Sequence, residues 1–190
     1  STTDAATPRW DTFRLFTLGK KRVENCQRVP MTTALLEGLP EAAIAPSLIG
    51  AEPLVRAEVR RLVSWFDDKF AREVSDLIHG EKFVKRFLTK GEPDSQAVRA
   101  GLTNIRTHLD YVAYLTERRN WLAGNEFSLA DVMAGAHISA IDYMVDVPWS
   151  KFEAAKEWYA RIKSRPSFRS LLEDHIPGFA PPKHYADLDF

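Results

Sequence analysis

Cysteine is the scarcest residue type in this 190-residue chain, and its scarcity excludes a disulfide-stapled fold. Cys26 is the only cysteine, so no intramolecular disulfide can form, a pattern typical of reducing compartments. An excess of one charge is also missing, because 26 basic residues balance 26 acidic ones. The balance gives no general reason to expect nucleic acid or an anionic membrane as a partner.

Long hydrophobic runs are missing as well. A helix that crosses a membrane needs about 20 consecutive apolar residues, and no run in the sequence approaches that length. Residues 1–6 lack the basic-then-apolar order of a signal peptide. We therefore expect no membrane insertion and a soluble, cytoplasmic protein.

Motifs for metal or phosphate chemistry are not found. The five histidines have no metal-ligand spacing with one another or with Cys26. The sequence contains no glycine-rich phosphate loop and no nucleophile elbow. His137 falls within an apolar stretch, where a hydrogen-bonded core histidine is expected rather than a ligand. We therefore predict no metal site and no resident cofactor.

A buried helix is the clearest element that the sequence predicts. Ser128 and Asp131 are spaced as a structural cap of the capping-box type, in which the carboxylate of Asp131 reaches back to the backbone N–H of Ser128. The helix that follows runs from Leu129 to about Met144 and is apolar on nearly every side. A helix of that composition lies at the centre of its domain, with other helices around it.

Two long amphipathic helices are predicted before this buried helix. Apolar residues recur at steps of three and four between residues 55 and 78, and again between residues 98 and 115. Gly80 is a candidate break after the first helix, and Asp94 or Ser95 is a candidate cap of the second. Because the turn between the two helices is short and polar, we expect them to pack antiparallel.

The end of the chain differs from the helical part. Residues 177–182 read Pro-Gly-Phe-Ala-Pro-Pro, which favours an extended backbone over a helix. Residues 183–190 alternate aromatic or apolar side chains with acidic ones. Two interpretations stay open: the tail lies along its own domain, or it is a linear motif for a partner.

Two motifs carry a resemblance to a known family. Trp-Leu-Ala-Gly at residues 121–124 leads into the capping box and the buried helix, and residues 158–168 read Trp-Tyr-Ala-Arg-Ile-Lys-Ser-Arg-Pro-Ser-Phe. Together these motifs resemble the C-terminal domain of glutathione transferases. The resemblance implies a thioredoxin-like α/β N-terminal part followed by an all-helical bundle. The implied domains are an incomplete thioredoxin-like part at residues 1–45, the helical domain at residues 53–176 and an extended tail at residues 177–190.

The resemblance also implies where glutathione chemistry would lie. In this family a Ser, Tyr or Cys at the start of the first helix activates the thiol of glutathione. Trp10 stands at that position, and an indole has no hydroxyl, so no catalytic residue is recognisable. Thr7 or Thr12 could serve only in a shifted register. Val29 and Pro30 match the family's glutathione-binding segment around its cis-proline.

One branch of the family is similar in more detail. Gly-Glu-Pro-Asp at residues 91–94, residues 159–166 and the ending 184–190 resemble alphaproteobacterial cell-division proteins that bind the tubulin-like protein FtsZ. This resemblance implies a homodimer, non-catalytic or weakly catalytic, that binds FtsZ filaments and uses its tail for a partner. The alternative is an active glutathione transferase that joins glutathione, as ligand and substrate, to small electrophiles. The tail residues expected to bind a partner are His184, Tyr185, Asp187, Leu188, Asp189 and Phe190.

Overall fold

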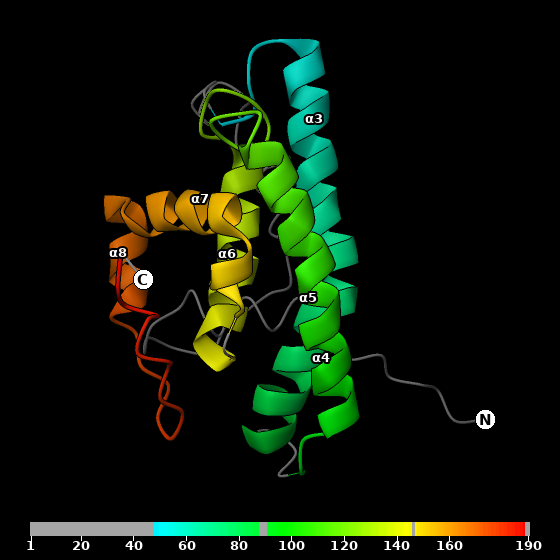
Figure 1. Cartoon of the computed structure of the whole chain (residues 1–190), viewed down its shortest axis with the longest axis vertical. Coiled ribbons are helices and arrows are strands. Elements are labelled where there is room, and N and C mark those ends of the chain that lie inside the picture. The colour runs from blue at the N-terminus through cyan, green and yellow to red at the C-terminus, as the bar shows by residue number, and fades with distance from the viewer. Residues whose placement is uncertain (1–47, 88–90, 146, 189–190) are drawn as a thin grey trace, which may run out of the picture.

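The computed structural model describes residues 48–87, 91–145 and 147–188, which fold into a bundle of helices joined by turns (Figure 1). In this part of the chain, no helix is both long and apolar enough to cross a membrane. The helical elements, in chain order, are α3 (Pro53–Ser64), η1 (Trp65–Ser75), α4 (Asp76–His79), η2 (Gly80–Lys85), α5 (Ser95–Thr116), α6 (Leu129–Met144), η3 (Trp149–Lys151), α7 (Glu153–Lys163) and α8 (Pro166–Leu172).

Several expectations fall on residues outside these ranges. The thioredoxin-like part at residues 1–45, with Trp10, Val29 and Pro30, lies outside the described residues, as do Asp189 and Phe190. The all-helical bundle lies within them, and the structure confirms it.

The first four elements form one continuous helical segment. Pro53 occupies the first turn of α3, where its missing N–H costs nothing. The expected break at Gly80 does not occur, because the φ of −54° and ψ of −47° at this residue are helical. Instead, η1 and η2 are π-helical, with wider turns than an α-helix. Such wide turns are frequently found at functional sites.

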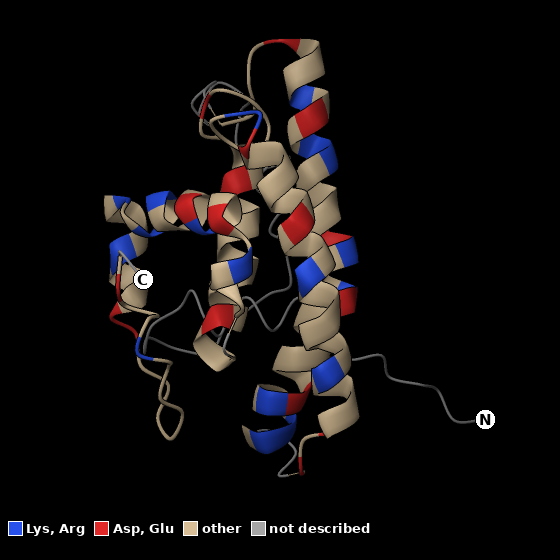
Figure 2. Cartoon of the chain, viewed as in Figure 1, with Lys and Arg blue, Asp and Glu red and all other residues tan. Residues whose placement is uncertain are grey.

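α5 packs against both η1 and α7. Its first turn is capped by Asp94, whose Oδ1 accepts hydrogen bonds from the backbone N–H groups of Gln96 at 2.8 Å and Ala97 at 3.4 Å. α3 and α5 run antiparallel along the length of the domain, as the short connection predicts (Figure 1). Bands of Arg and Glu follow one another along α3 (Figure 2).

α6 is the central helix, with the same bounds that the sequence predicts. It packs against α3, η1, α4 and α7, and residues on every side of it are buried. His137, in the middle of α6, is a core residue whose Nδ1 lies 3.1 Å from the hydroxyl of Ser75. The prediction of a hydrogen-bonded core histidine is therefore confirmed.

The C-terminal tail turns back along its own domain (Figure 1), where hydrogen bonds hold it to α6 and α7. Tyr185 is fully buried, and Ile176, Phe179 and Leu188 pack against the hydrophobic core. The sequence left two interpretations of the tail open. The structure agrees with the first, in which residues 176–188 lie along their own domain.

Candidate functional site

The predicted cap at the start of α6 is a junction between three parts of the fold. Both halves of the capping box are present, and Asp131 Oδ2 accepts from the backbone N–H of Ser128 at 3.0 Å and from its hydroxyl at 2.9 Å. Asp131 Oδ1 accepts from the backbone N–H of Leu122 at 3.0 Å and from the indole of Trp158 at 2.9 Å. The carboxylate is fully buried and compensated by four donors, so its role is structural.

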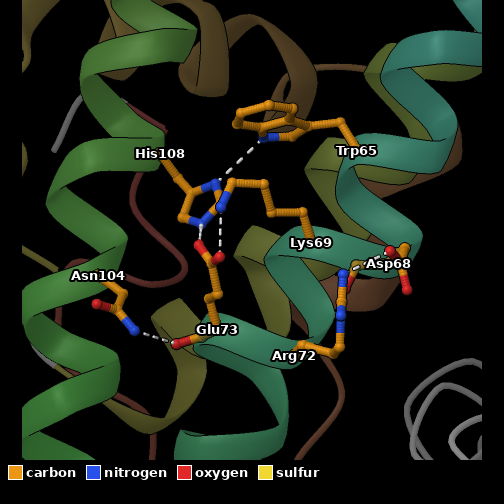
Figure 3. Close-up of polar contacts among 7 residues, drawn as sticks. All are labelled: Trp65, Asp68, Lys69, Arg72, Glu73, Asn104 and His108. Atoms are coloured by element: carbon orange, nitrogen blue, oxygen red, sulfur yellow. Dashed lines mark hydrogen bonds and ion pairs between the residues drawn. The ribbon is translucent and has the colours of Figure 1, made fainter.

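A polar cluster joins η1 to α5, and we call it the seam cluster: Trp65, Lys69, Glu73, Asn104 and His108. Figure 3 shows the three η1 residues facing the two α5 residues. The indole N–H of Trp65 donates to His108 Nδ1 at 3.2 Å, and His108 Nε2 lies 3.0 Å from Glu73 Oε2. Lys69 donates to the other carboxylate oxygen of Glu73, and Asn104 donates to the backbone carbonyl of Glu73 at 2.9 Å.

The hydrogen bonds of the seam cluster determine the tautomer of His108. An indole N–H can only donate, so Nδ1 accepts and the ring proton is on Nε2, which donates to Glu73. Burial lowers the pKa of His108, against the opposing effect of Glu73. His108 is 1% exposed, whereas the Glu73 side chain is 40% exposed, so the cluster connects a buried neutral imidazole to a charge at the surface.

A second network continues along the same seam towards the turn before α6. Glu58 accepts from Arg61 at 2.7 Å and from Arg119 at 2.8 Å, and Arg119 also donates to the backbone carbonyl of Leu122 at 3.0 Å. The hydrogen bond from Arg61, with that from Arg119, lowers the pKa of Glu58 to about 2. Arg61 also donates to the Tyr111 hydroxyl at 2.7 Å. The seam therefore presents charged and aromatic side chains that are already held in place.

A cleft opens at the upper end of the seam. Its volume is about 370 Å³, and residues 50–59 line one side and residues 123–128 the other. The backbone N–H of Leu129 donates to the carbonyl of Leu48 at 2.8 Å, which fixes the chain at the edge of this cleft. The cleft offers space for a small molecule, and the residues that line it include the polar Glu52, Asn125, Glu126 and Ser128.

The tail is anchored by a stripe of polar residues on α6. The hydroxyls of Ser139 and Tyr185 are 2.9 Å apart, and Asp142 Oδ1 lies 2.9 Å from His184 Nε2. The Tyr143 hydroxyl accepts from the backbone N–H of Ile176 and donates to the carbonyl of Phe179, both at 2.9 Å. Ser139, Asp142 and Tyr143 are three and four residues apart, which places them on one face of the helix.

Lys163, in the last turn of α7, contributes a further anchor. Its ammonium donates to the backbone carbonyl of His184 at 3.1 Å and to that of Asp187. Lys163 is fully buried, and burial lowers its pKa to about 8. The side chains of Ala186 and Asp187 stay exposed on the outer side of the tail.

Sequence reasoning missed both His108 and Lys163. Each falls on the inward face of its helix, beside Ile105 and Leu109 in one case and Tyr159 and Ile162 in the other. A titratable residue at such a position needs a buried partner. The position is visible in the sequence, but the partner is not, because it lies far along the chain. Among the described residues, no group of three His, Cys, Asp or Glu has a geometry that could hold a metal ion.

Comparison with known proteins places this architecture in a family. The family described as "Glutathione S-transferase, C-terminal domain" matches residues 55–166. FtsZ-localized protein A of Caulobacter vibrioides (strain NA1000 / CB15N) is 52% identical over 159 residues, which cover 84% of this chain and 70% of that protein.

Solved structures give the same result. A glutathione S-transferase from Rhodospirillum rubrum F11 is 53% identical with a TM-score of 0.78, and the match covers 83% of this chain and 70% of that one. FzlA from C. crescentus is 52% identical with a TM-score of 0.78 and the same coverage of both chains. With a family match across the helical bundle and relatives at this level of identity, the chain belongs to the glutathione S-transferase family.

Proposed function

We propose that this protein acts in bacterial cell division by binding filaments of FtsZ. The observation that carries the proposal is the 52% identity to FtsZ-localized protein A over 84% of the chain. At this level of identity, we expect a binding surface of that relative to be kept in this chain. Binding to FtsZ also implies a cytoplasmic location, which is part of the same proposal.

Co-sedimentation tests the proposal directly. Purified protein is mixed with FtsZ and GTP, filaments are pelleted, and the bound fraction is measured against protein concentration. We expect saturable pelleting with GTP and only background pelleting with GDP, which does not support stable filaments, or without FtsZ. Equal pelleting with and without filaments would refute the proposal. The same preparations, measured by light scattering, test for the homodimer that the family resemblance implies.

The tail is proposed to serve a further partner. Because His184 and Tyr185 anchor residues 176–188 within the domain, deleting the whole tail would also uncover the core. A shorter deletion, of Asp189 and Phe190, keeps the residues that make the anchoring contacts described above. We expect this variant to pellet with FtsZ like the intact protein and to fail to support division in cells that lack their own copy. Full support of division by the variant would remove these two residues from the proposal.

The second candidate function is glutathione conjugation. It is favoured by the cleft of about 370 Å³ beside α3 and by the identity of 53% to the glutathione S-transferase from Rhodospirillum rubrum. Fold membership does not determine activity, so it requires its own test. Calorimetry with glutathione, together with turnover of a generic electrophilic substrate, provides it. Binding with turnover would establish an enzyme; no binding at millimolar glutathione would leave FtsZ binding as the function.

A further inference from the structure

The tail is attached to the domain at two separate places. The inner attachment is the Tyr143 hydroxyl, which holds the turn at residues 176–179. The outer attachment holds residues 184–187 and is made by side chains of α6 and α7. Between them lie Ala180 to Lys183, which include two prolines and whose side chains are partly or fully exposed.

The part of the outer attachment that comes from α7 consists of one ammonium group and two backbone carbonyls. Lys163 donates to the carbonyls of His184 and Asp187. These two residues are the ends of a tight turn, which is closed by a hydrogen bond of 3.1 Å from the N–H of Asp187 to the carbonyl of His184. Hydrogen bonds from a charged donor are stronger than neutral ones. Lys163 therefore holds this turn through its backbone, in addition to the side-chain contacts that His184 and Tyr185 make with α6.

We propose that residues 184–188 form a strap that is latched to the helical domain by Lys163 and opens as a unit while the domain stays folded. Tyr143 keeps residues 176–179 in place when the strap opens, so that residues 180–183 act as its hinge. The latch is independent of what the protein binds, because it is built wholly from contacts within this chain.

The surroundings of Lys163 support a latch that the strap shields from water. The charged groups that face the ammonium are Asp142 on α6 and Asp187 on the strap. The ring of Tyr159, on α7, lies 5.5 Å from the ammonium. The other titratable groups nearby are His184 and Tyr185 on the strap. Burial outweighs the two carboxylates and lowers the pKa of Lys163. When the strap opens, water can reach the ammonium and replace the hydrogen bonds that it loses. The strap can therefore open and close reversibly.

Limited digestion with trypsin measures the opening, because Lys183 is an exposed cleavage site directly before the strap. Release of the peptide 184–190 is followed by mass spectrometry in the intact protein and in Lys163→Met, which keeps the size of the side chain and removes the ammonium. We expect release to be about tenfold faster in this variant, since proteolysis of a locally opened segment follows the population of the open state. Lys151→Met, at an exposed lysine of η3, is the matched control and should behave as the intact protein.

A second variant keeps the test decisive if Lys163→Met does not fold. Tyr185→Ala loosens the strap from its own side, removing the contact with Ser139 and leaving α7 unchanged. We expect it also to accelerate release of 184–190, with circular dichroism and cleavage within α3 unchanged. Release at the intact rate in a folded Lys163→Met protein would overturn the latch. Equal acceleration of cleavage within α3 would overturn it too, because the strap would then open only with the whole domain.

Discussion

The indole N–H of Trp158 donates to the buried carboxylate of Asp131 at 2.9 Å, joining α7 to the start of α6. The two residues are 27 positions apart in the chain. The same carboxylate also accepts from the backbone N–H of Leu122, in the turn before α6. Asp131 therefore caps its own helix and also connects α6 to α7 and to that turn.

Replacing Asp131 with Asn should destabilise the fold. The amide group of Asn would place donors against the N–H and hydroxyl of Ser128, so we expect the free energy of unfolding to fall by about 2 to 3 kcal/mol. Urea denaturation measures the change. Asp94→Asn is the matched control: Asn is an equally good cap, so a loss of only a few tenths of a kcal/mol is expected there. Equal losses in the two variants would show that the tertiary contacts of Asp131 contribute nothing.

Trp65→Phe should raise the pKa of His108. The substitution removes the indole donor and frees Nδ1 to accept a proton, while burial still favours the neutral ring. We also expect about 1 kcal/mol of lost stability from the missing hydrogen bond. An NMR titration of the histidine ring signals measures the shift. Trp121→Phe, where the ring packs on Phe127 instead, should leave the titration of His108 unchanged.

Glu58 should make stability depend on pH in the acid range. Hydrogen bonds from Arg61 and Arg119 lower its pKa from 4.5 to about 2 in the folded state. The unfolded chain therefore binds the proton more readily, so the contribution of Glu58 is complete above pH 4.5 and is lost as the pH falls towards 2.

We expect this contribution to be about 1 to 2 kcal/mol, after allowance for screening by water at a partly exposed pair. Unfolding in urea at a series of pH values, for the intact protein and Glu58→Gln, measures it. The difference between the two should shrink as the pH falls through this range. A difference that stays constant from pH 6 to pH 2 would contradict the assignment.

Two glycine substitutions should have opposite effects. A Cβ at Gly101 in α5 would lie 2.7 Å from Ile78 Cγ1 and 3.3 Å from Leu77 Cβ, so Gly101→Ala should be destabilising by about 1 to 3 kcal/mol. A Cβ at Gly80 would meet nothing within 4 Å, and its backbone is helical. Gly80→Ala should therefore be stabilising by about 0.5 to 1 kcal/mol. Thermal unfolding of both variants tests the pair, and destabilisation by Gly80→Ala would show that the wide π-turns require glycine there.

Local patterns in the sequence determined much of the helical domain. The cap at Ser128 and Asp131 joins residues three apart, and the apolar composition of residues 129–144 is enough to place α6 at the centre, because a helix without a polar face needs neighbours on every side. The predicted helix break at Gly80 was wrong. Glycine lowers the stability of a helix only slightly, and packing of the flanking turns against α5 and α6 outweighs this loss.

Only the tertiary structure decided the partners of His108 and Lys163. Their positions on inward helix faces were readable, but Trp65 lies 43 residues from His108, and His184 lies 21 residues from Lys163. No periodicity relates residues at such separations, since a helix pattern reports which face is buried and not what covers it. In the sequence, Lys163 is a lysine at the end of a helix, where a cation is common. The fold brings two backbone carbonyls of the tail to that same ammonium. Every residue has a backbone carbonyl, so the amino-acid sequence cannot identify which carbonyls will become the partners of a lysine.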